Sequence, residues 1–257
     1  MAHRRSQTIA STSVIAVIPA RLASTRLPEK ALADIGGTPM VVRVWRQASR
    51  AASLGRVLVA TDHERIYSAV KAAGGEAMMT SREHQSGTDR IAEVARAIDA
   101  DVFLNVQGDL PFIAAADLDA LARPMLDDPS LAMATLAAPI TEPAEFRNPN
   151  VVKVVLGRSG NALYFSRAPV PFPRDDRAGV PDAALRHIGV YAYRRDFLLE
   201  FARLPPGVLE RIEKLEQLRA LENGYTIRVV PSVAPSLEID TAEELAKARE
   251  LVGRGAV

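Results

Sequence analysis

Apolar and polar positions along the chain follow two periods, one typical of buried strands and one typical of amphipathic helices. Predominantly apolar runs occur at residues 14–18, 57–60 and 102–106, as expected for strands that are buried on both faces of a sheet. Between them, apolar residues follow the i, i+3, i+4, i+7 spacing of a helix, as in Val41, Val44, Trp45 and Ala48. This alternation predicts an α/β fold with a Rossmann-like, doubly wound mixed sheet.

The middle of the chain lacks the long helical segments found on either side of it. Residues 131–194 contain several strand-like runs and include a proline-rich stretch, residues 169–181, which we interpret as a mobile loop. The sequence therefore predicts a single α/β domain over residues 1–257, with a smaller, partly antiparallel lobe inserted at residues 131–194. Two helices, near residues 209–222 and 241–252, are expected to close the chain.

The first of these two helices carries two charged side chains on its apolar face. The apolar arc consists of Leu209, Ile212, Leu215 and Leu218, and at about 100° per residue Glu216 and Arg219 fall inside it. Charged groups in that position must be paired or must face a polar ligand, so an i, i+3 ion pair and a ligand site both stay open. His187, just before an apolar-rich strand, carries the same ambiguity between a structural and a ligand-binding role.

Composition narrows the class of protein. Of the 257 residues, 48% are hydrophobic, and the 32 Lys and Arg nearly balance the 31 Asp and Glu, so no basic excess indicates a nucleic-acid partner. No cysteine is present, which excludes disulfides, thiolate catalysis and Cys-ligated zinc. No run reaches the roughly 20 apolar residues of a membrane span, and the first apolar run is too short for a signal peptide. We expect a soluble, cytoplasmic protein without a membrane partner.

A basic loop follows the first predicted strand, at the end of the sheet where α/β folds bind ligands. Within residues 19–30, three cations, Arg21, Arg26 and Lys30, stand among small residues with accessible backbone N–H groups. A triphosphate needs this combination of fixed positive charge and backbone donors. The segment is neither a P-loop nor a dinucleotide fingerprint, and a solvated basic loop stays open as the alternative.

Two aspartates are candidates for a shared metal. Asp109 follows a strongly apolar strand and a turn at Gly108, and Asp240 stands just before the last predicted helix. Carboxylates from distant segments can together hold one Mg²⁺, which offsets developing charge in nucleotidyl transfer. Taken singly, Asp109 also fits a turn residue and Asp240 a favourable charge at a helix N-terminus.

Several motifs together resemble a known family. Residues 19–30, followed by IGGTPM at 35–40, look like the opening of nucleotide-sugar-forming nucleotidyltransferases. Further segments narrow the resemblance, namely HQSGTDR at 84–90, NVQGDLP at 105–111, RHIGVY at 186–191 and LEQLR at 215–219. Together they resemble the 3-deoxy-manno-octulosonate (Kdo) cytidylyltransferases over residues 14–252.

The resemblance implies a role for each candidate residue. It implies that the nucleotide site consists of Ala20, Arg21, Arg26, Lys30, Ser86 and Arg90. It implies that Asp109 and Asp240 bind Mg²⁺ and act with Arg21 and Lys30 as the catalytic group. It implies that the Kdo site consists of Gln107, Arg167, His187, Tyr191, Glu216 and Gln217.

The resemblance also implies the reaction and the assembly. In this family the anomeric 2-hydroxyl of Kdo attacks the α-phosphorus of CTP, and pyrophosphate leaves, which yields CMP-Kdo for lipopolysaccharide synthesis. The family usually forms a homodimer, and we expect the smaller lobe at 131–194 to carry both the sugar site and the dimer contact. Charge neutralisation by a metal and by Arg and Lys side chains explains a site without a catalytic His or Cys.

Two positions depart from the family pattern. Leu110 stands where the family commonly has Glu, and Glu238 stands where it commonly has Gly. Leu110 would remove a carboxylate near the metal, whereas Glu238 adds one and forbids a backbone conformation that requires glycine. Two alternatives follow from these departures: a synthetase for a related acidic sugar, such as 8-amino-Kdo or a nonulosonic acid, and a catalytically silent nucleotide-binding protein on the same fold.

Overall fold

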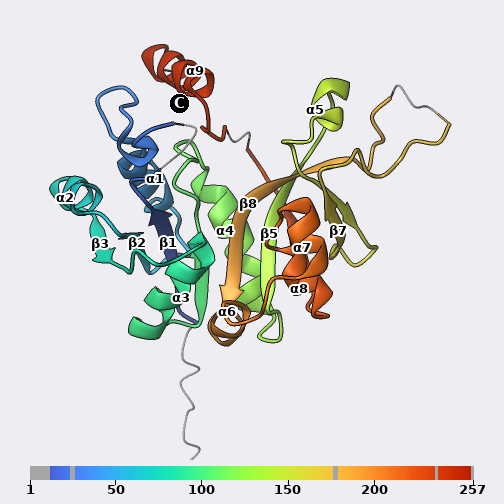
Figure 1. The fold of residues 1–257 in the computed structure, drawn as a ribbon, viewed down its shortest axis with the longest axis horizontal. Helices are drawn as coiled ribbons and strands as arrows, with labels where there is room; N and C mark the ends of the chain where they lie inside the picture. Colours follow the sequence, from blue (N-terminus) through green and yellow to red (C-terminus); the bar gives the residue numbers. More distant parts are fainter. Residues whose placement is uncertain (1–11, 24–26, 176–178, 235–236, 256–257) are drawn as a thin grey trace, which may run out of the picture.

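The computed structural model describes residues 12–23, 27–175, 179–234 and 237–255. Within these ranges, nine strands form one mixed sheet, and helices lie on both sides of it (Figure 1). The strand order is β3-β2-β1-β4-β8-β5-β9, and β6 is attached through β8 and pairs with β7. This arrangement is the mixed, doubly wound α/β sheet that the sequence predicts.

The bounds of the elements are close to those predicted for most of the chain. The strands are β1 (Val14–Ala20), β2 (Arg56–Thr61), β3 (Glu76–Met79), β4 (Val102–Asn105), β5 (Met133–Pro139), β6 (Lys153–Leu156), β7 (Ala162–Ser166), β8 (Leu185–Arg194) and β9 (Ile227–Pro231). The helices are η1 (Lys30–Leu32, a 3₁₀ turn), α1 (Met40–Ala48), α2 (Glu64–Ala72), α3 (Gly87–Ala97), α4 (Ala115–Asp127), α5 (Pro143–Arg147), α6 (Arg195–Phe201), α7 (Val208–Glu213), α8 (Leu218–Glu222) and α9 (Ala242–Gly253). Among the described residues, no helix combines the length and the apolar character that crossing a membrane would require.

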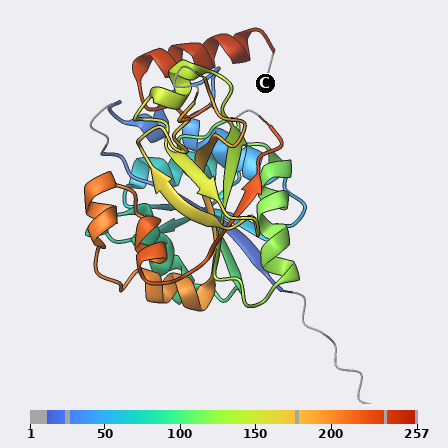
Figure 2. The same ribbon diagram turned by 90° about the vertical axis from the view of Figure 1, so that its right-hand side faces the viewer.

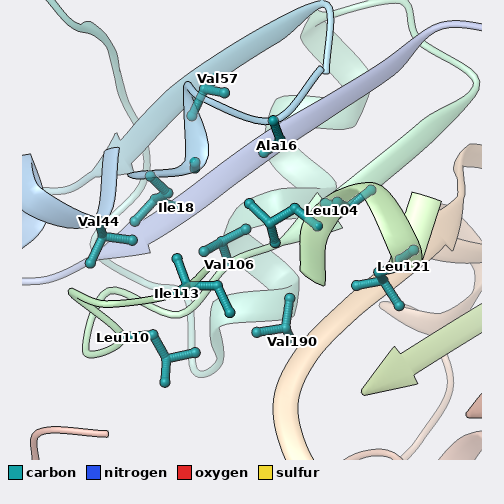
Figure 3. Close-up of a cluster of buried hydrophobic side chains, with 14 of the residues drawn as sticks. Ala16, Ile18, Val44, Val57, Leu104, Val106, Leu110, Ile113, Leu121 and Val190 are labelled. Carbon is teal, nitrogen blue, oxygen red and sulfur yellow. The ribbon is translucent and has the colours of Figure 1, made fainter. Parts of the chain in front are cut away.

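The side chains of β1 divide the interior into two cores. Val14, Ala16 and Ile18 face one hydrophobic cluster, which includes residues of α1 and α4 and is shown in part in Figure 3. Ile15 and Val17 face the opposite cluster, which includes residues of α3 and α6. Alternation with a period of two is the geometry of a strand, and burial on both faces explains why the run contains no polar residue.

The parallel half of the sheet brings distant loops to one edge. β1 pairs in parallel with both β2 and β4, whereas β8 runs antiparallel to β4 and β5. Because parallel strands end at the same edge, the loops after β1 and β4 meet there.

A small separate core fixes the last helix at that edge. Ile35 and Met40 pack with Ile239 and Leu245 around the start of α9. The backbone N–H of Ile239 donates to the carbonyl oxygen of Asp109 at 3.0 Å. The segment before α9 is therefore held directly against the loop after β4, although 130 positions separate the two residues.

Residues 131–194 contribute to the central sheet as well as extending it. β5 and β8 are both members of the main strand order, and the β6–β7 hairpin, yellow in Figure 2, is added beside the first part of β8. β8 thus pairs with β6 near Leu185 and with β4 near Tyr191. One long strand connects the hairpin to the edge where β4 ends.

The single helix predicted over residues 209–222 is wrong, because the segment forms two short helices. Lys214 adopts a left-handed conformation, with φ 56° and ψ 46°, and separates α7 from α8. The predicted apolar arc is therefore interrupted. Leu209 and Ile212 are 36% and 72% exposed, while the two later leucines of the arc are buried.

Glu222 is the physical reason for the break. Its carboxylate accepts hydrogen bonds from the backbone N–H groups of Leu209 at 2.9 Å and Glu210 at 3.2 Å, so the end of α8 folds back onto the start of α7. Gly207 permits this approach, since a Cβ there would lie 1.8 Å from Oε2 of Glu222. Helical periodicity carries no signal for a cap supplied from a neighbouring helix.

Lys153 on β6 is a buried cation that organises the hairpin. Its side chain is fully buried, and its Nζ donates to the carbonyl oxygens of Asn148 at 2.9 Å, Val151 at 2.5 Å and Arg167 at 2.7 Å. Burial, with the nearby charge of Arg167, lowers the pKa of this ammonium. Three acceptors match the three donors of the group, which satisfies a buried ion that would otherwise be costly.

We expect Lys153→Met to lower the free energy of unfolding by about 2–4 kcal/mol, because it keeps most of the side-chain volume and leaves three carbonyl oxygens without their donor. Urea unfolding measures the change. Lys71→Met, at an exposed position of α2, is the control and should change the free energy by less than about 0.5 kcal/mol. Equal effects of the two substitutions would contradict the organising role.

Candidate active site

A cavity of about 330 Å³ opens at the edge of the sheet where β1 and β4 end. Its walls are the end of β1 with the loop that follows, the first turn of α3, the loop after β4, and the segment before α9. Of the predicted site residues, the cavity brings together Ala20, Arg21, Lys30, Ser86, Arg90, Gln107, Asp109 and Asp240. Arg26 lies outside the described residues.

Two glycines allow the walls to converge on Pro19. A Cβ at Gly87 would lie 3.2 Å from Cγ of Pro19, and a Cβ at Gly108 would lie 3.3 Å from its carbonyl oxygen. The first turn of α3 and the loop after β4 can therefore both approach the end of β1. Close backbone approach of this kind is a frequent use of glycine at ligand sites.

The first turn of α3 presents an ordered helix N-terminus to the cavity. Ser86 caps the helix, because its Oγ accepts the backbone N–H of Asp89 at 3.1 Å while the carboxylate of Asp89 accepts the backbone N–H of Ser86. This capping box fixes the direction of the first helical turn. A helix N-terminus favours anionic ligands.

Arg90 lines the cavity but is already held by the protein. It is 3% exposed, and its guanidinium donates to Asp62 at 2.9 Å and to the Oγ1 of Thr80 at 2.5 Å. These bonds tie α3 to the ends of β2 and β3. Arg21, by contrast, is exposed beside the same cavity.

Three carboxylates and one ammonium form the opposite wall. Asp109, Glu238 and Asp240 each place a carboxylate oxygen within 4.8 Å of the others. Nζ of Lys30 lies between two of them, 2.8 Å from Oδ2 of Asp109 and 2.9 Å from Oδ1 of Asp240. The two predicted aspartates therefore do meet, and the structure adds Glu238 to them.

The acidic group shifts the titration of its neighbours. Burial alone would lower the pKa of Lys30, but the charges and hydrogen bonds of Asp109 and Asp240 outweigh it and leave this pKa raised. The pKa of Glu238 is raised, because protein atoms displace part of the water around its carboxylate, although the residue as a whole is exposed, and because Asp109 and Asp240 repel its charge. Crowded carboxylates raise one another's pKa in this way.

The residues fit a hard divalent cation. Oδ1 of Asp109 is buried and has no hydrogen-bond partner among the described residues, which is costly unless a ligand supplies the contact. Carboxylate oxygens are the ligands that Mg²⁺ prefers, with water and substrate oxygens in the remaining positions. Asp109 and Asp240 would hold the ion, and Glu238 lies within reach of it.

The two positions that depart from the family pattern, Leu110 and Glu238, lie in different environments. Leu110 is 3% exposed and belongs to the main hydrophobic cluster, shown in Figure 3, so its side chain does not line the cavity. Glu238 does line the cavity. Positive φ angles outside glycine occur among the described residues at Glu29 and Lys214, so the backbone at Glu238 does not require glycine.

The predicted sugar-site residues continue from the cavity along β8. Gln107 lines the cavity, and a Cβ at Gly189 of β8 would lie 4.0 Å from its Cγ. The others, Arg167, His187, Tyr191, Glu216 and Gln217, do not line it. Glu216 is linked to the cavity wall through its hydrogen bond to Thr88 of α3, and contact of these residues with a ligand stays a prediction.

His187 and Tyr191 lie in an aromatic row beside β5. The ring of His187 packs edge-on against Phe165 with centroids 5.0 Å apart, and the ring of Tyr191 is 5.3 Å away. Nε2 of His187 lies 2.9 Å from Oγ1 of Thr135. Burial lowers the pKa of His187 to about 3, so its imidazole is neutral at physiological pH. Burial, with the charges of Glu216 and Glu238, raises the pKa of Tyr191.

Glu216 contacts the first turn of α3 and also forms a long ion pair with Arg219. Oε2 of Glu216 accepts the Oγ1–H of Thr88 at 2.5 Å. Arg219 forms two hydrogen bonds with Glu210, at 2.8 and 2.6 Å, and approaches Glu216 only to 3.8 Å. The pKa of Glu216 is raised, because burial outweighs the Thr88 hydrogen bond and the charge of Arg219. The i, i+3 ion pair with Arg219 is therefore present at 3.8 Å, and contact of Glu216 with a ligand stays a prediction.

Gln217 is buried and Arg167 is hydrogen-bonded to other parts of the chain, and neither lines the cavity. Gln217 is 3% exposed next to Glu216. Nε of Arg167 donates to the carbonyl oxygen of Glu213 at 2.7 Å, and its Nη1 donates to that of Pro149 at 3.0 Å. The guanidinium thus also joins the hairpin to α7.

Sequence reasoning missed other residues that line the cavity. His84 and Gln85 line it directly before the α3 cap, and His84 contacts the carboxylate of Glu93 on α3. Their segment carries the family resemblance, but no chemical role was predicted for either residue. Glu238, by contrast, was predicted to add a carboxylate near the metal, and it lies in the acidic group.

The chain is similar in sequence to known proteins. The model of a family described as cytidylyltransferase matches residues 15–227. A 3-deoxy-manno-octulosonate cytidylyltransferase of Pelobacter propionicus is 52% identical over 246 residues, which cover 93% of this chain and 96% of that protein. The enzyme of the same name from Geobacter sulfurreducens is 50% identical over 93% of this chain and 98% of its own.

Solved structures are similar as well. A CMP:2-keto-3-deoxy-manno-octonic acid synthetase complexed with CTP superposes with a TM-score of 0.90 at 44% identity, covering 95% of this chain and all of the other. A 4-diphosphocytidyl-2C-methyl-D-erythritol synthase from Anaerococcus prevotii superposes with a TM-score of 0.62 at 12% identity. The second likeness confirms the fold class and carries no further argument.

The low pKa of His187 makes a prediction for stability against pH. Its imidazole has a pKa of about 3 in the folded protein and about 6.5 in the unfolded chain. Below pH 6.5 the unfolded chain therefore binds a proton that the folded protein does not, and stability falls as the pH falls from 6.5 towards 3. Between pH 8 and pH 5 this loss amounts to at most about 2 kcal/mol.

We expect His187→Gln to remove this component, so the wild-type advantage over the variant should shrink between pH 8 and pH 5. Urea unfolding at pH 8, 6.5 and 5 measures the difference. Glutamine keeps a donor and an acceptor for Thr135 but does not titrate. A difference that stays constant over this range would show that His187 titrates normally in the folded protein.

Proposed function

This chain belongs to the cytidylyltransferases, and within them to the family of 3-deoxy-manno-octulosonate cytidylyltransferases, and we propose from this that it transfers CMP from CTP to Kdo and releases pyrophosphate. One observation of the site carries the proposal: a single cavity places the basic loop after β1 against the carboxylates of Asp109, Glu238 and Asp240. The product is the activated sugar for lipopolysaccharide synthesis. We place the reaction in the cytoplasm, where CTP is made.

The nucleotide binds at the end of β1. Arg21 and Lys30 neutralise the triphosphate, and the capped N-terminus of α3 at Ser86 adds backbone donors and a favourable dipole. Ala20 lets the nucleotide approach the strand end closely. Arg90 acts by fixing the loop before α3, since its own donors are occupied by Asp62 and Thr80. Arg26 belongs to the same basic loop and keeps its predicted role towards the phosphates.

Asp109 and Asp240 bind Mg²⁺. When bound, the ion neutralises charge on the α-phosphate and lowers the pKa of the attacking hydroxyl. The unpartnered Oδ1 of Asp109 supports this assignment. Lys30 keeps the two carboxylates side by side through its hydrogen bonds to both, so little ordering is needed when the ion arrives.

Kdo binds between the acidic group and β8. Gln107 and Tyr191 provide polar atoms nearest the cavity, and the neutral imidazole of His187 offers a hydrogen bond to a sugar hydroxyl without a charge to be solvated. The Glu216 carboxylate accepts hydrogen bonds from further sugar hydroxyls, and the Gln217 amide accepts from and donates to them. Arg167 binds the sugar carboxylate from the side of the β6–β7 hairpin. The closeness of Gly189 to Gln107 supports this continuous path from the nucleotide to the sugar.

The reaction is a direct displacement at phosphorus. The anomeric hydroxyl oxygen of Kdo forms a bond to the α-phosphorus while the bond to the β-phosphate bridging oxygen breaks. The hydroxyl proton passes to solvent water, and the electron pair of the broken bond leaves with pyrophosphate. The protein needs no covalent nucleophile, because holding two anionic substrates in line and neutralising their charge supply most of the catalysis.

We expect Asp109→Asn and Asp240→Asn each to lower turnover by two orders of magnitude or more, since each removes a charged ligand of the ion but keeps the side-chain shape. Pyrophosphate release with CTP, Mg²⁺ and Kdo measures this effect, and circular dichroism confirms the fold. Asp127→Asn, at an exposed end of α4, is the control and should retain full activity. Near-normal turnover in either site variant would overturn the shared-metal assignment.

The same assay tests the substrate when Kdo, 8-amino-Kdo and sialic acid are compared. Rapid release with Kdo, abolished by EDTA, is the expected result. Release with one of the other sugars alone would keep the chemistry and change the substrate. CTP binding without release from any sugar would support a catalytically silent nucleotide-binding protein instead.

The chain forms a homodimer through the lobe at 131–194. This part of the proposal is supported by two large apolar side chains of that region, Leu163 and Phe172, which are 63% and 64% exposed. We expect light scattering to give twice the chain mass for the wild type and a monomer for Leu163→Asp. A monomeric wild type, or a dimer that Leu163→Asp leaves unchanged, would exclude a contact through Leu163.

A further inference from the structure

Glu238 adds a third carboxylate to the two that the ion needs. It lines the cavity, and one of its carboxylate oxygens lies within 4.8 Å of oxygens of both Asp109 and Asp240.

The local chain geometry directs Glu238 and Asp240 to the same side. Ile239, between them, is fully buried in the small core under α9, and its backbone N–H is bonded to the carbonyl oxygen of Asp109. With Ile239 pointing inwards, its two neighbours point outwards into the cavity, as alternate residues of an extended chain do. The position of Glu238 is therefore set by the same anchor that sets Asp240.

The four side chains of this acidic group carry an excess of negative charge. Three carboxylates surround one ammonium, that of Lys30, which bonds to Asp109 and Asp240. Within these four side chains, two formal negative charges remain, which is the charge that one divalent cation neutralises. Like charges held this close repel one another without a cation between them.

A second observation points to a ligand at this place. Oδ1 of Asp109 is buried and has no hydrogen-bond partner among the described residues. The ammonium of Lys30 occupies the other oxygen, Oδ2. An ion held by Oδ1 of Asp109 and a carboxylate oxygen of Asp240 would therefore have Glu238 beside it as the remaining acidic group.

We propose that Glu238 is a third acidic ligand of the divalent ion, bound directly or through one water, and that it strengthens metal binding in this chain. The inference rests on the proposed function, because that function requires the ion at Asp109 and Asp240. Carboxylate number is a main determinant of affinity for hard divalent cations. We therefore expect loss of Glu238 to weaken metal binding, and to lower turnover only because less metal is bound.

Manganese titration tests the inference without relying on activity. Electron paramagnetic resonance reports free Mn²⁺ during titration of the full chain, with and without CTP. We expect Glu238→Gln and Glu238→Gly each to weaken binding about tenfold or more, as loss of a metal-site partner typically does. Glu64→Gln, at an exposed carboxylate on α2, is the matched control and should bind as the wild type does. Affinities of the Glu238 variants within twofold of the wild type would overturn the inference.

Thermal unfolding gives a second readout that a merely structural role would not produce. In EDTA, Glu238→Gln should melt at a higher temperature than the wild type, because it relieves repulsion between carboxylates. Addition of Mn²⁺ should raise the melting temperature above its value in EDTA by less for the variant than for the wild type. The reason is that a ligand stabilises a protein more when it binds more tightly. Equal gains in both proteins would contradict the proposal.

The two experiments separate failure of this inference from failure of the proposed function. If Asp240→Asn abolishes Mn²⁺ binding and Glu238→Gln does not weaken it, the ion site stands and Glu238 is not a ligand. If the wild type binds no Mn²⁺, even with CTP present, both proposals fall together.

Discussion

The ammonium of Lys30 holds two carboxylates that arrive from opposite ends of the sequence, Asp109 after β4 and Asp240 before α9. The rest of the site depends on this contact. It joins the basic loop after β1 to the acidic wall, so the groups that bind phosphate and the groups that bind an ion share one cavity. An isolated pair of aspartates would repel, and Lys30 permits them to lie together before any ligand is bound.

The cavity is lined both by residues that other parts of the protein hold in place and by an exposed side chain. The walls converge on Pro19 with little free space, and capping at Ser86 and the buried bonds of Arg90 fix the first turn of α3. Arg21, by contrast, is an exposed cation at the mouth of the cavity. Preorganised donors on fixed elements give electrostatic stabilisation at the least reorganisation cost, while an exposed cation can follow the ligand into place.

The α/β fold could be predicted from the sequence because it follows from strong local rules, whereas the meeting of Asp109 with Asp240 was one of the alternatives that the sequence left open. Buried parallel strands are apolar on both faces, and parallel strands deliver their following loops to one edge. The interpretation of residues 209–222 was wrong, because the break at Lys214 depends on the cap that Glu222 supplies from the next helix. A contact between two helices cannot be predicted from the hydrophobic periodicity of either helix.

The same limit explains the partner of Glu216 and the place of Leu110. Spacing pairs Glu216 with Arg219, but tertiary packing gives Arg219 to Glu210 and turns Glu216 towards Thr88. Leu110 is next to Asp109 in sequence, yet it points into the hydrophobic cluster and leaves the acidic wall unchanged. Neighbours in sequence can thus belong to different environments when a turn separates their side chains.

The anchoring of Ile239 makes the acidic wall depend on the docking of α9. Ile239 packs in the small core under α9, and Glu238 and Asp240 flank it, whereas Asp109 belongs to the loop after β4. Local opening of that small core would carry two of the three carboxylates away from the third and leave the central sheet folded. Loss of the ion site would then precede loss of the fold when the protein is destabilised.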